Sequence, residues 1–408
     1  MDAHHPTAPA LPARPWERMA HGGGLLDAAG ELSSTVFEEM SFLAARTGAA
    51  NLGQGFPDTD GPPEMLEAAA AALRGGMNQY APIAGLPVLR EAVAEHQRRF
   101  YGIGLDPASE VLVTAGATEG LAASLLAFLE PGDEVVTFAP HYDAYGAVVE
   151  FAGARLVTVP LLPPAFAPDP DQVRAAFGPR TRMVILNDPH NPTGAVFDDA
   201  VLEQVAELAE EHDCVVVTDE VYEHLRYTGA HRPLASRPAG AERTLTVSSV
   251  GKTFSATGWR VGWVTGPARL LRAVQATKAY LSHSAAAPLQ AATAAALALP
   301  DAFYAGLLED YRRRRDVLLT GLAAAGAEAF EPQGSFFVVA DVGGLCARHG
   351  VPDAAALSRV LPEAAGVVAI PVTAFVPAPQ RDVYRDWLRF AFCKRTEVLE
   401  QAVQRLAG

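Results

Sequence analysis

A lysine and an arginine stand among small hydroxyl residues in one stretch, residues 244–263. A strand-like apolar run leads into Ser248 and Ser249, then Lys252 follows between glycine, serine and threonine, and Arg260 comes eight residues later. A lysine here could be a solvated loop charge, a phosphate contact or an amine nucleophile. The neighbouring arginine and serines offer the donors that hold a phosphate dianion. Together they favour a phosphorylated carbonyl cofactor held on the lysine as a Schiff base.

Other strand-like runs also end in small or polar residues. Val111–Val113 is followed by Ala115–Gly120 and a helical segment, so free backbone N–H groups at the helix start could bind an anion. The glycines follow neither the dinucleotide fingerprint nor the Walker pattern, which argues against a dehydrogenase or an NTPase. Val215–Val217 is followed by Asp219 and Glu220. No histidine or acidic set at ligand spacing accompanies them, so we expect no metal site.

Two further loops carry candidate ligand-binding groups. Asn187–Gly194 contains two asparagines and two prolines, which predicts a rigid loop with amide donors and a cis peptide bond at Asn191–Pro192. Tyr142 follows the strand-like run Val135–Phe138. An aromatic ring there either stacks on a planar ligand or packs in the core.

The order of apolar runs predicts an α/β fold. From Val111 to Thr265, short apolar runs alternate with helical segments, which is typical of a mostly parallel sheet covered by helices on both faces. The pattern then changes to long helices, a strand pair at Phe336–Ala340 and Val367–Ile370, and a strand-like run at Leu388–Phe392. We therefore expect a second, smaller α+β domain.

Length and composition limit the class of protein. The chain has 408 residues, suits two domains, and has a formal net charge of -15, which disfavours nucleic acid or an anionic membrane as a partner. Three scattered cysteines, Cys214, Cys346 and Cys393, indicate thiols in a reducing compartment. No apolar run is long enough to span a membrane, and the N-terminus lacks the pattern of a secretory signal. These observations predict a cytoplasmic location.

The N-terminal part has its own composition. Residues 1–30 are rich in proline and alanine, which favours a flexible segment over a metal site at His4 and His5. The remaining expected boundaries are residues 31–60 for the N-terminal part of the small domain, 61–300 for the large, cofactor-binding domain and 301–408 for the C-terminal small domain.

From about residue 33 to its end, the chain resembles the class I aminotransferases that use pyridoxal 5'-phosphate and have fold type I. The resemblance rests on motifs in family order: NLGQGFPD, NQYAP, LNDPHNPTG, VVTDEVYEH, SSVGKTFSATGWRVGW and RFAFCK. The nearest branch contains the kynurenine (glutamine), methionine and N-succinyldiaminopimelate aminotransferases. The implied fold has a large domain with a mostly parallel seven-stranded sheet flanked by helices.

The resemblance implies a role for each cofactor-site residue. Lys252 would form an aldimine with the cofactor and later shuttle a proton. Asp219 would keep the pyridine nitrogen protonated, since a buried carboxylate raises its pKa. Tyr222 and Asn191 would hydrogen-bond the ring oxygen. Tyr142 would stack on the ring, and the phosphate would be held by Ala117, Thr118, Ser249 and Arg260.

The resemblance also implies the substrate contacts and a homodimer. Tyr80 would reach the phosphate of the neighbouring subunit. Arg389 would bind the substrate α-carboxylate with two hydrogen bonds, helped by Asn187 and the backbone of Gly53. The side-chain pocket would include Phe56, Tyr145 and Ser282–Ser284, whereas His141 has no assigned role.

The expected activity is a ping-pong transfer of an amino group from an L-amino acid to a 2-oxo acid, as in amino acid biosynthesis. Candidate donors are N-succinyldiaminopimelate, kynurenine, methionine and glutamine, with glutamate and 2-oxoglutarate as the counterpart pair. A C–S β-lyase or an oxidase or cyclase of specialised metabolism would use the same cofactor. A cofactor-sensing transcription regulator needs a basic DNA-binding module, for which the N-terminal segment is too short and not basic enough.

Overall fold

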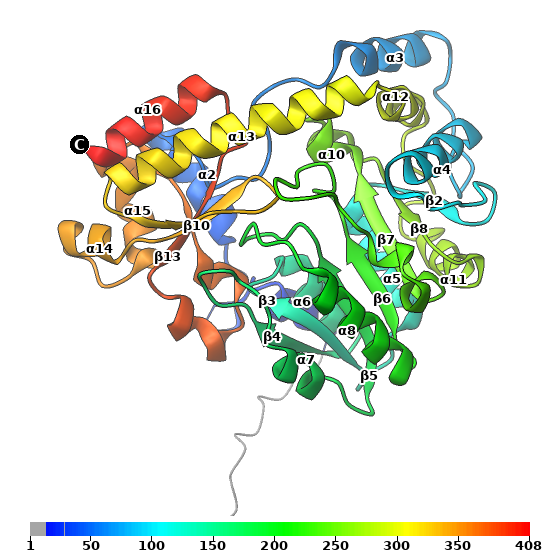
Figure 1. The fold of residues 1–408 in the computed structure, drawn as a ribbon, viewed down its shortest axis with the longest axis horizontal. Coiled ribbons are helices and arrows are strands. Elements are labelled where there is room, and N and C mark those ends of the chain that lie inside the picture. The colour runs from blue at the N-terminus through cyan, green and yellow to red at the C-terminus, as the bar shows by residue number, and fades with distance from the viewer. Residues whose placement is uncertain (1–13, 28) are drawn as a thin grey trace, which may run out of the picture.

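A seven-stranded mixed sheet forms the centre of the larger part of the molecule (Figure 1). The computed structural model describes residues 14–27 and 29–408. The strand order is β2-β8-β7-β6-β5-β3-β4, and β8 runs antiparallel to both of its neighbours while the other pairs are parallel. The strands are β2 (Val111–Thr114), β3 (Glu134–Ala139), β4 (Arg155–Pro160), β5 (Thr181–Asn187), β6 (Val215–Asp219), β7 (Thr244–Ser249) and β8 (Gly262–Thr265). This confirms the mostly parallel sheet.

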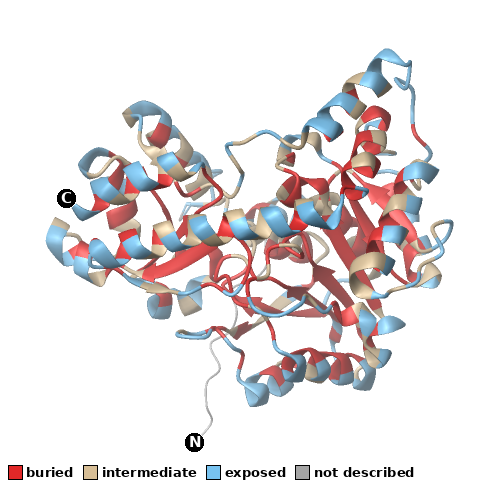
Figure 2. Cartoon of the chain, turned by 45° about the horizontal axis from the view of Figure 1, so that its top comes forward, coloured by how far each residue is buried: buried red, intermediate tan, exposed pale blue. Residues whose placement is uncertain are grey.

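Helices bury both faces of this sheet because neighbouring strand residues point to opposite sides. Val135 packs with α5, α6 and α11, whereas Val136 packs with α7 and α8. Figure 2 shows the buried strands inside a shell of helices with exposed outer surfaces. The helices of this part are α3 (Pro63–Arg74), α4 (Pro87–Tyr101), α5 (Ala117–Phe128), α6 (Asp143–Phe151), α7 (Pro170–Ala176), α8 (Asp199–Glu211), α9 (Pro238–Ala241), α10 (Val250–Thr253), α11 (Ala268–Lys278) and α12 (Ala287–Leu297).

A smaller sheet lies in the other half of the molecule, in the order β12-β13-β10-β9. Its strands are β9 (Glu328–Phe330), β10 (Phe337–Asp341), β12 (Ile370–Pro371) and β13 (Trp387–Ala391). A separate parallel pair joins β1 (Ala50–Asn51) to β11 (Val367–Val368). The surrounding helices are α2 (Val36–Thr47), α13 (Asp301–Ala324), α14 (Gly343–His349), α15 (Ala354–Ala364) and α16 (Thr396–Ala407).

The expected strand pair, Phe336–Ala340 with Val367–Ile370, does not form, because each run pairs with other strands. Residues 337–341 pair with β9 and β13, and the run at 367–370 is divided between β11, which pairs with β1, and β12, which pairs with β13. The apolar pattern identifies each run as a strand but carries no information on which strands become its partners, because pairing depends on tertiary packing.

An N-terminal helix, α1 (Pro15–Gly22), packs against α6 within the segment that was expected to be flexible. The two backbones approach so closely at Gly22 and Gly146 that a Cβ on Gly146 would lie 2.5 Å from the Gly22 carbonyl oxygen. Arg18 Nε donates to the Glu150 carbonyl, 3.1 Å away. Pro15 in the first turn marks the start of this short helix, and the Glu17 carboxylate accepts a 3.0 Å hydrogen bond from the Arg14 N–H. Residues 1–13, including His4 and His5, lie outside the described residues.

All three cysteines are buried and free. Within the described ranges, no single helix is long and apolar enough to span a membrane. Helices α12 and α13 reach that length and composition only when taken together, and they are bent by 89° at the break between them.

Candidate active site

A cavity of about 150 Å³ lies where the parallel strands of the large sheet reach their carboxyl ends, which is where ligands bind in open α/β sheets. Ten of the thirteen expected site residues line it, and the other three are Tyr80, Arg389 and Gly53. The full lining is Ala117, Thr118, Leu121, Tyr142, Asn187, Asn191, Asp219, Val221, Tyr222, Ser249, Gly251, Lys252, Thr257 and Arg260.

Lys252 enters the cavity from α10, the short helix that follows β7. Its Nζ donates a 2.8 Å hydrogen bond to the Gly55 carbonyl and lies 5.8 Å from the centre of the Tyr222 ring. Desolvation lowers the pKa of the amine from 10.5 to about 8, although Asp219 pulls in the other direction. A lysine with so low a pKa reaches its neutral, nucleophilic form more readily than one in water.

Asp219 ends β6 and is buried at the bottom of the cavity. Burial raises the pKa of its carboxyl to about 6, and a hydrogen bond from Tyr145 opposes this rise. Asn187 fixes the backbone beside it, since Nδ2 donates to the Asp219 carbonyl at 2.8 Å and Oδ1 accepts from the Asn191 N–H at 2.7 Å. Both ends of the Asn187 amide therefore have partners in the chain, and its substrate contact stays a prediction.

The start of α5 and the side chains opposite it form a cradle for an anion. The first turn of a helix leaves backbone N–H groups without partners inside the helix. Gly116 has φ +83°, and a Cβ there would lie 2.5 Å from a nitrogen of the Arg260 guanidinium. Arg260, whose own φ is 53°, lies with Nη2 3.5 Å from the Thr118 hydroxyl. Ser249 completes the lining. These donors fit a phosphate.

Aromatic rings form the walls of the cavity. Tyr142 caps the start of α6 and meets Tyr145 edge to face, with ring centres 5.7 Å apart. Tyr222 is buried against Phe336 and Phe337. Such rings make a slot for a flat heteroaromatic group, and Asp219 and the anion cradle line the same cavity.

Arg389 projects from β13 of the small sheet towards this slot and is buried. Nη1 donates to Oδ1 of Asn191 at 3.0 Å, and Nη2 donates to the Gly53 carbonyl. The guanidinium lies between the rings of Phe337 and Phe375, at 4.1 and 4.5 Å from their centres. Desolvation lowers its pKa from 12.5 to about 10. Its Nε has no partner among the described residues, so the group keeps a donor for a ligand.

The remaining residues singled out from the sequence are placed as follows. Tyr80 is 87% exposed and does not line the cavity of its own chain. Tyr145, expected in the side-chain pocket, instead donates a hydrogen bond to Asp219. The Asn191–Pro192 peptide bond is cis, as predicted. His141, which had no assigned role, is buried beside Tyr145 with its ring nearly parallel to the phenol, 6.2 Å between centres.

The contact of Tyr145 with Asp219 was not predicted, although the sequence places Tyr145 close to Tyr142. Tyr142 and Tyr145 are three residues apart at the start of a helix, and this spacing puts both on one face. Gly55, Gly251 and Thr257 were also not predicted as site residues: Gly55 acts through its backbone oxygen, Gly251 lies inside α10, and Thr257 begins a short 3₁₀ turn.

Behind Asp219, further titratable groups are buried. Ser248 points away from the cavity and donates a 2.7 Å hydrogen bond to Oε1 of Glu223. His96, Glu223 and His224 have potential ligand atoms within 4.8 Å of one another. The Nε2 atoms of the two histidines are 2.7 Å apart, which is hydrogen-bond distance.

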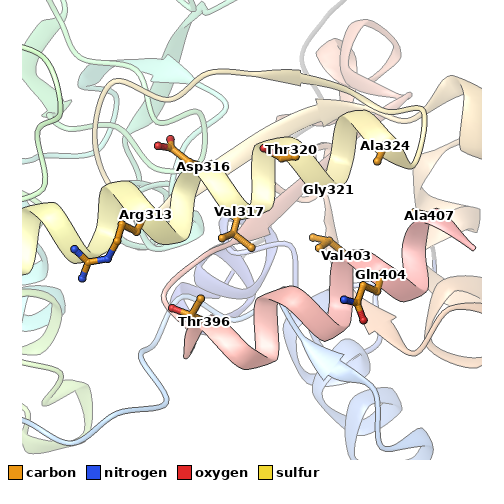
Figure 3. A pocket seen from close by; sticks show the side chains of 10 residues that line it. All are labelled: Arg313, Asp316, Val317, Thr320, Gly321, Ala324, Thr396, Val403, Gln404 and Ala407. Atoms are coloured by element: carbon orange, nitrogen blue, oxygen red, sulfur yellow. The ribbon is translucent and has the colours of Figure 1, made fainter.

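A second hollow, about 710 Å³ and wide open, lies between α13 and α16 (Figure 3). Its lining is mainly apolar, with Val317 and Val403 facing each other across the groove. The nucleophile, the buried carboxylate and the anion cradle all line the smaller cavity, so the chemistry belongs there.

A half-buried lysine, a buried carboxylate, an anion cradle and an aromatic slot define a fold type I aminotransferase site for pyridoxal phosphate. Residues 47–406 match the family model "Aminotransferase class I and II", and the chain belongs to that family.

Known relatives agree with this assignment. The chain is 50% identical to the N-succinyldiaminopimelate aminotransferase structure from Mycobacterium tuberculosis, covering 92% of this chain and 97% of that one with a TM-score of 0.88. It is 36% identical to the methionine aminotransferase structure from Escherichia coli, covering 92% and 97%, with a TM-score of 0.87. It is 35% identical to kynurenine–oxoglutarate transaminase 3 of Mus musculus, covering 91% and 87%.

The protein is therefore an aminotransferase that depends on pyridoxal phosphate. When bound, this cofactor offers an aldehyde carbon to a primary amine and a ring that accepts electrons from the substrate.

Proposed function

We propose that this enzyme transfers the amino group from N-succinyldiaminopimelate to 2-oxoglutarate by a ping-pong reaction, which forms glutamate and the 2-oxo acid of the donor. The observation that carries this substrate choice is the 50% identity to N-succinyldiaminopimelate aminotransferase over nearly the full length of both chains. Relatives named for methionine, aspartate or prephenate, and kynurenine are 33–40% identical. The 50% identity therefore favours N-succinyldiaminopimelate as the substrate.

Each residue of the slot has a proposed task. Lys252 holds the cofactor covalently and, once displaced, moves a proton at the substrate Cα, for which its pKa of about 8 is suited. Asp219 faces the ring nitrogen and keeps it protonated. Tyr222 and Asn191 hydrogen-bond the ring oxygen, and Tyr142 stacks on the ring. The anion cradle of Ala117, Thr118, Ser249 and Arg260 holds the phosphate.

Arg389 is the proposed anchor for the α-carboxylate of both substrates. A guanidinium binds a carboxylate with two parallel hydrogen bonds. The Phe337 and Phe375 rings hold it in one plane, and Asn191 ties it to the cofactor slot. This arrangement orients the Cα–H bond towards Lys252 and keeps water away from the reacting atoms.

The active unit is proposed to be a homodimer in which Tyr80 reaches the partner's phosphate. Support comes from large apolar and aromatic side chains that are exposed on neighbouring segments of the large part of the molecule: Leu66, Leu73, Met77, Tyr80, Val88, Tyr280 and Leu281. Exposed apolar surface of this kind marks protein–protein contacts. The cytoplasmic location and the role in amino acid biosynthesis stay predictions.

A panel of amino donors tests the substrate. The purified enzyme is assayed with 2-oxoglutarate and, in turn, N-succinyldiaminopimelate, kynurenine, methionine, glutamine and aspartate. The proposal expects kcat/KM for N-succinyldiaminopimelate to exceed every other value by about 100-fold or more, the size of a discrimination based on placed polar groups. A higher value for another donor would reassign the substrate. Pyruvate or peroxide formation without an acceptor would favour the lyase or the oxidase.

A further inference from the structure

Two surface loops of this chain lie against each other, and both expose aromatic side chains. The first, residues 75–86, connects α3 to α4 and carries Tyr80. The second, residues 279–286, connects α11 to α12 and carries Tyr280, which is 95% exposed, and His283. The rings of Tyr80 and His283 meet edge to face with centres 5.3 Å apart. Neither loop contributes to the cavity of its own chain.

Lys278 forms hydrogen bonds to the backbones of both loops. It is the last residue of α11 and is fully buried. Its Nζ donates to the Ile83 carbonyl at 2.7 Å and to the His283 carbonyl at 2.8 Å. A buried ammonium with two carbonyl acceptors fixes both backbones, because releasing either would leave a charged group short of a partner.

Gln290, in the first turn of α12, joins the same loops a second time. Its Oε1 accepts from the Leu86 N–H at 2.8 Å, and its Nε2 donates to the Ala285 carbonyl at 2.7 Å. The side chain is fully buried. Between the two links, Gly85 has φ +99°, and a Cβ there would lie 2.2 Å from Val113. The first loop is therefore seated on β2 and has little freedom to shift.

From these contacts we infer that Lys278 and Gln290 are positioning residues for the active site of the neighbouring subunit: they hold Tyr80 and His283 as one rigid unit that is presented to the partner. The inference rests on the proposed homodimer. The ligand group concerned is the cofactor phosphate at the partner's cradle, where the Tyr80 hydroxyl donates a hydrogen bond. His283, which packs on Tyr80, restricts the orientation of that ring.

A purely structural role would act within the chain that carries the substitution. The proposed role acts across the interface: substitution of Lys278 impairs the site of the other subunit. Hybrid dimers separate the two cases, because a Lys252→Ala subunit has no reactive lysine and leaves one live site per dimer.

Two hybrids are compared, each purified through different tags on its two subunits. In the first, Lys252→Ala is on one subunit and Lys278→Met on the other, so the live site receives an intact loop. In the second, both substitutions are on one subunit with a wild-type partner, so the live site receives the altered loop. Both hybrids contain the same substitutions, and a general loss of stability affects them alike.

Pyridoxal phosphate is titrated into each apo hybrid, and binding at the live lysine is followed by its visible absorption. We expect wild-type affinity in the first hybrid and about 10-fold to 100-fold weaker binding in the second, the scale on which misplaced groups act. Pyridoxal, which lacks the phosphate, should bind both hybrids equally. Equal affinities for pyridoxal phosphate, or the stronger defect in the first hybrid, would overturn the inference.

Gln290, which also connects the two loops, supplies an independent variant if Lys278→Met subunits fail to fold. Gln290→Leu replaces Lys278→Met in the same two hybrids and should give the same order. Thr293→Val is the matched control, since its hydroxyl bonds only to the Leu289 carbonyl within the same helix, and it should leave the hybrids equal. A chain that purifies as a monomer, or that transaminates no amino acid, would instead contradict the proposed function.

Discussion

The phenolic hydroxyl of Tyr145 donates a 2.7 Å hydrogen bond to Oδ2 of Asp219, and both side chains are buried. The tyrosine comes from the first turn of α6 and the aspartate from the end of β6, so the bond ties a helix to the catalytic edge of the sheet. It favours the ionised carboxylate, because the donor stabilises the negative charge against desolvation.

Replacing Tyr145 with phenylalanine should raise the pKa of Asp219 above about 6 by removing this donor. In its proposed role, Asp219 must be ionised to support a protonated ring nitrogen, so the acidic limb of the kcat profile should move to higher pH. We expect kcat at neutral pH to fall about 10-fold. The pH profile of kcat measures both effects.

Tyr384→Phe is the control for that substitution. This buried hydroxyl lies 3.2 Å from the carbonyl oxygens of Ala139 and Leu161, away from Asp219. It should lower stability and leave the acidic limb in place. An unchanged limb in Tyr145→Phe would mean that the hydrogen bond does not tune Asp219.

Arg389→Lys keeps the positive charge and removes the forked donor. An ammonium that bonds to Asn191 and Gly53 has one donor left and cannot give a substrate carboxylate two parallel hydrogen bonds. We therefore expect kcat/KM for an amino acid to fall about 100-fold, mostly through KM. The matched substrate is a primary amine without an α-carboxylate. Its slow reaction should be unaffected, and an equal loss for both substrates would show that Arg389 does not bind the carboxylate.

Gly116→Ala should weaken phosphate binding. An L-residue is strained at φ +83°, and its Cβ would lie 2.5 Å from the Arg260 guanidinium, which must move out of the cradle. We expect pyridoxal phosphate to bind the apoenzyme about 10-fold more weakly. Pyridoxal serves as the comparison, and a parallel loss for pyridoxal would place the defect outside the phosphate cradle.

Glu223→Gln should change how stability depends on pH. Burial raises the pKa of Glu223 from 4.5 to about 7, helped by the nearby charge of Glu220 and opposed by the Ser248 hydroxyl. Between pH 4.5 and 7, the folded state therefore holds a proton that the unfolded state has released. The free energy of unfolding falls as pH rises through this window.

Glutamine does not titrate, so the contribution of Glu223 to the pH dependence of the free energy of unfolding should disappear. Between pH 5 and pH 8 this contribution is up to about 3 kcal/mol. Denaturant unfolding of the apoprotein at the two pH values measures it. Glu64→Gln on the exposed side of α3 is the control. A wild-type pH dependence in Glu223→Gln would contradict the assignment.

The sequence predicted those parts of the site that depend on local motifs. Lys252, Asp219 and the Asn191 loop each follow a recognisable strand, and strands of a parallel sheet bring their carboxyl ends to one edge. The sequence did not predict long-range strand pairing. For example, the parallel pair of β1 with β11 joins residues more than 300 positions apart. The direction of Tyr145 depends on how α6 rotates against the sheet, which a short apolar pattern does not determine.

The domain boundaries at residues 30, 60 and 300 stay predictions. The α1 helix was not predicted because eight residues carry too little periodicity to separate a helix from a loop, and its position depends on the close glycine contact with α6.

A single half-reaction tests whether the bound cofactor takes the amino group of N-succinyldiaminopimelate. The holoenzyme is mixed with N-succinyldiaminopimelate without an acceptor, and the visible absorption of the bound cofactor is recorded. The account predicts that the band bleaches as the cofactor takes the amino group, returns on addition of 2-oxoglutarate, and is missing in Lys252→Ala. A protein that takes up no pyridoxal phosphate, or a band that no amino acid changes, would contradict it.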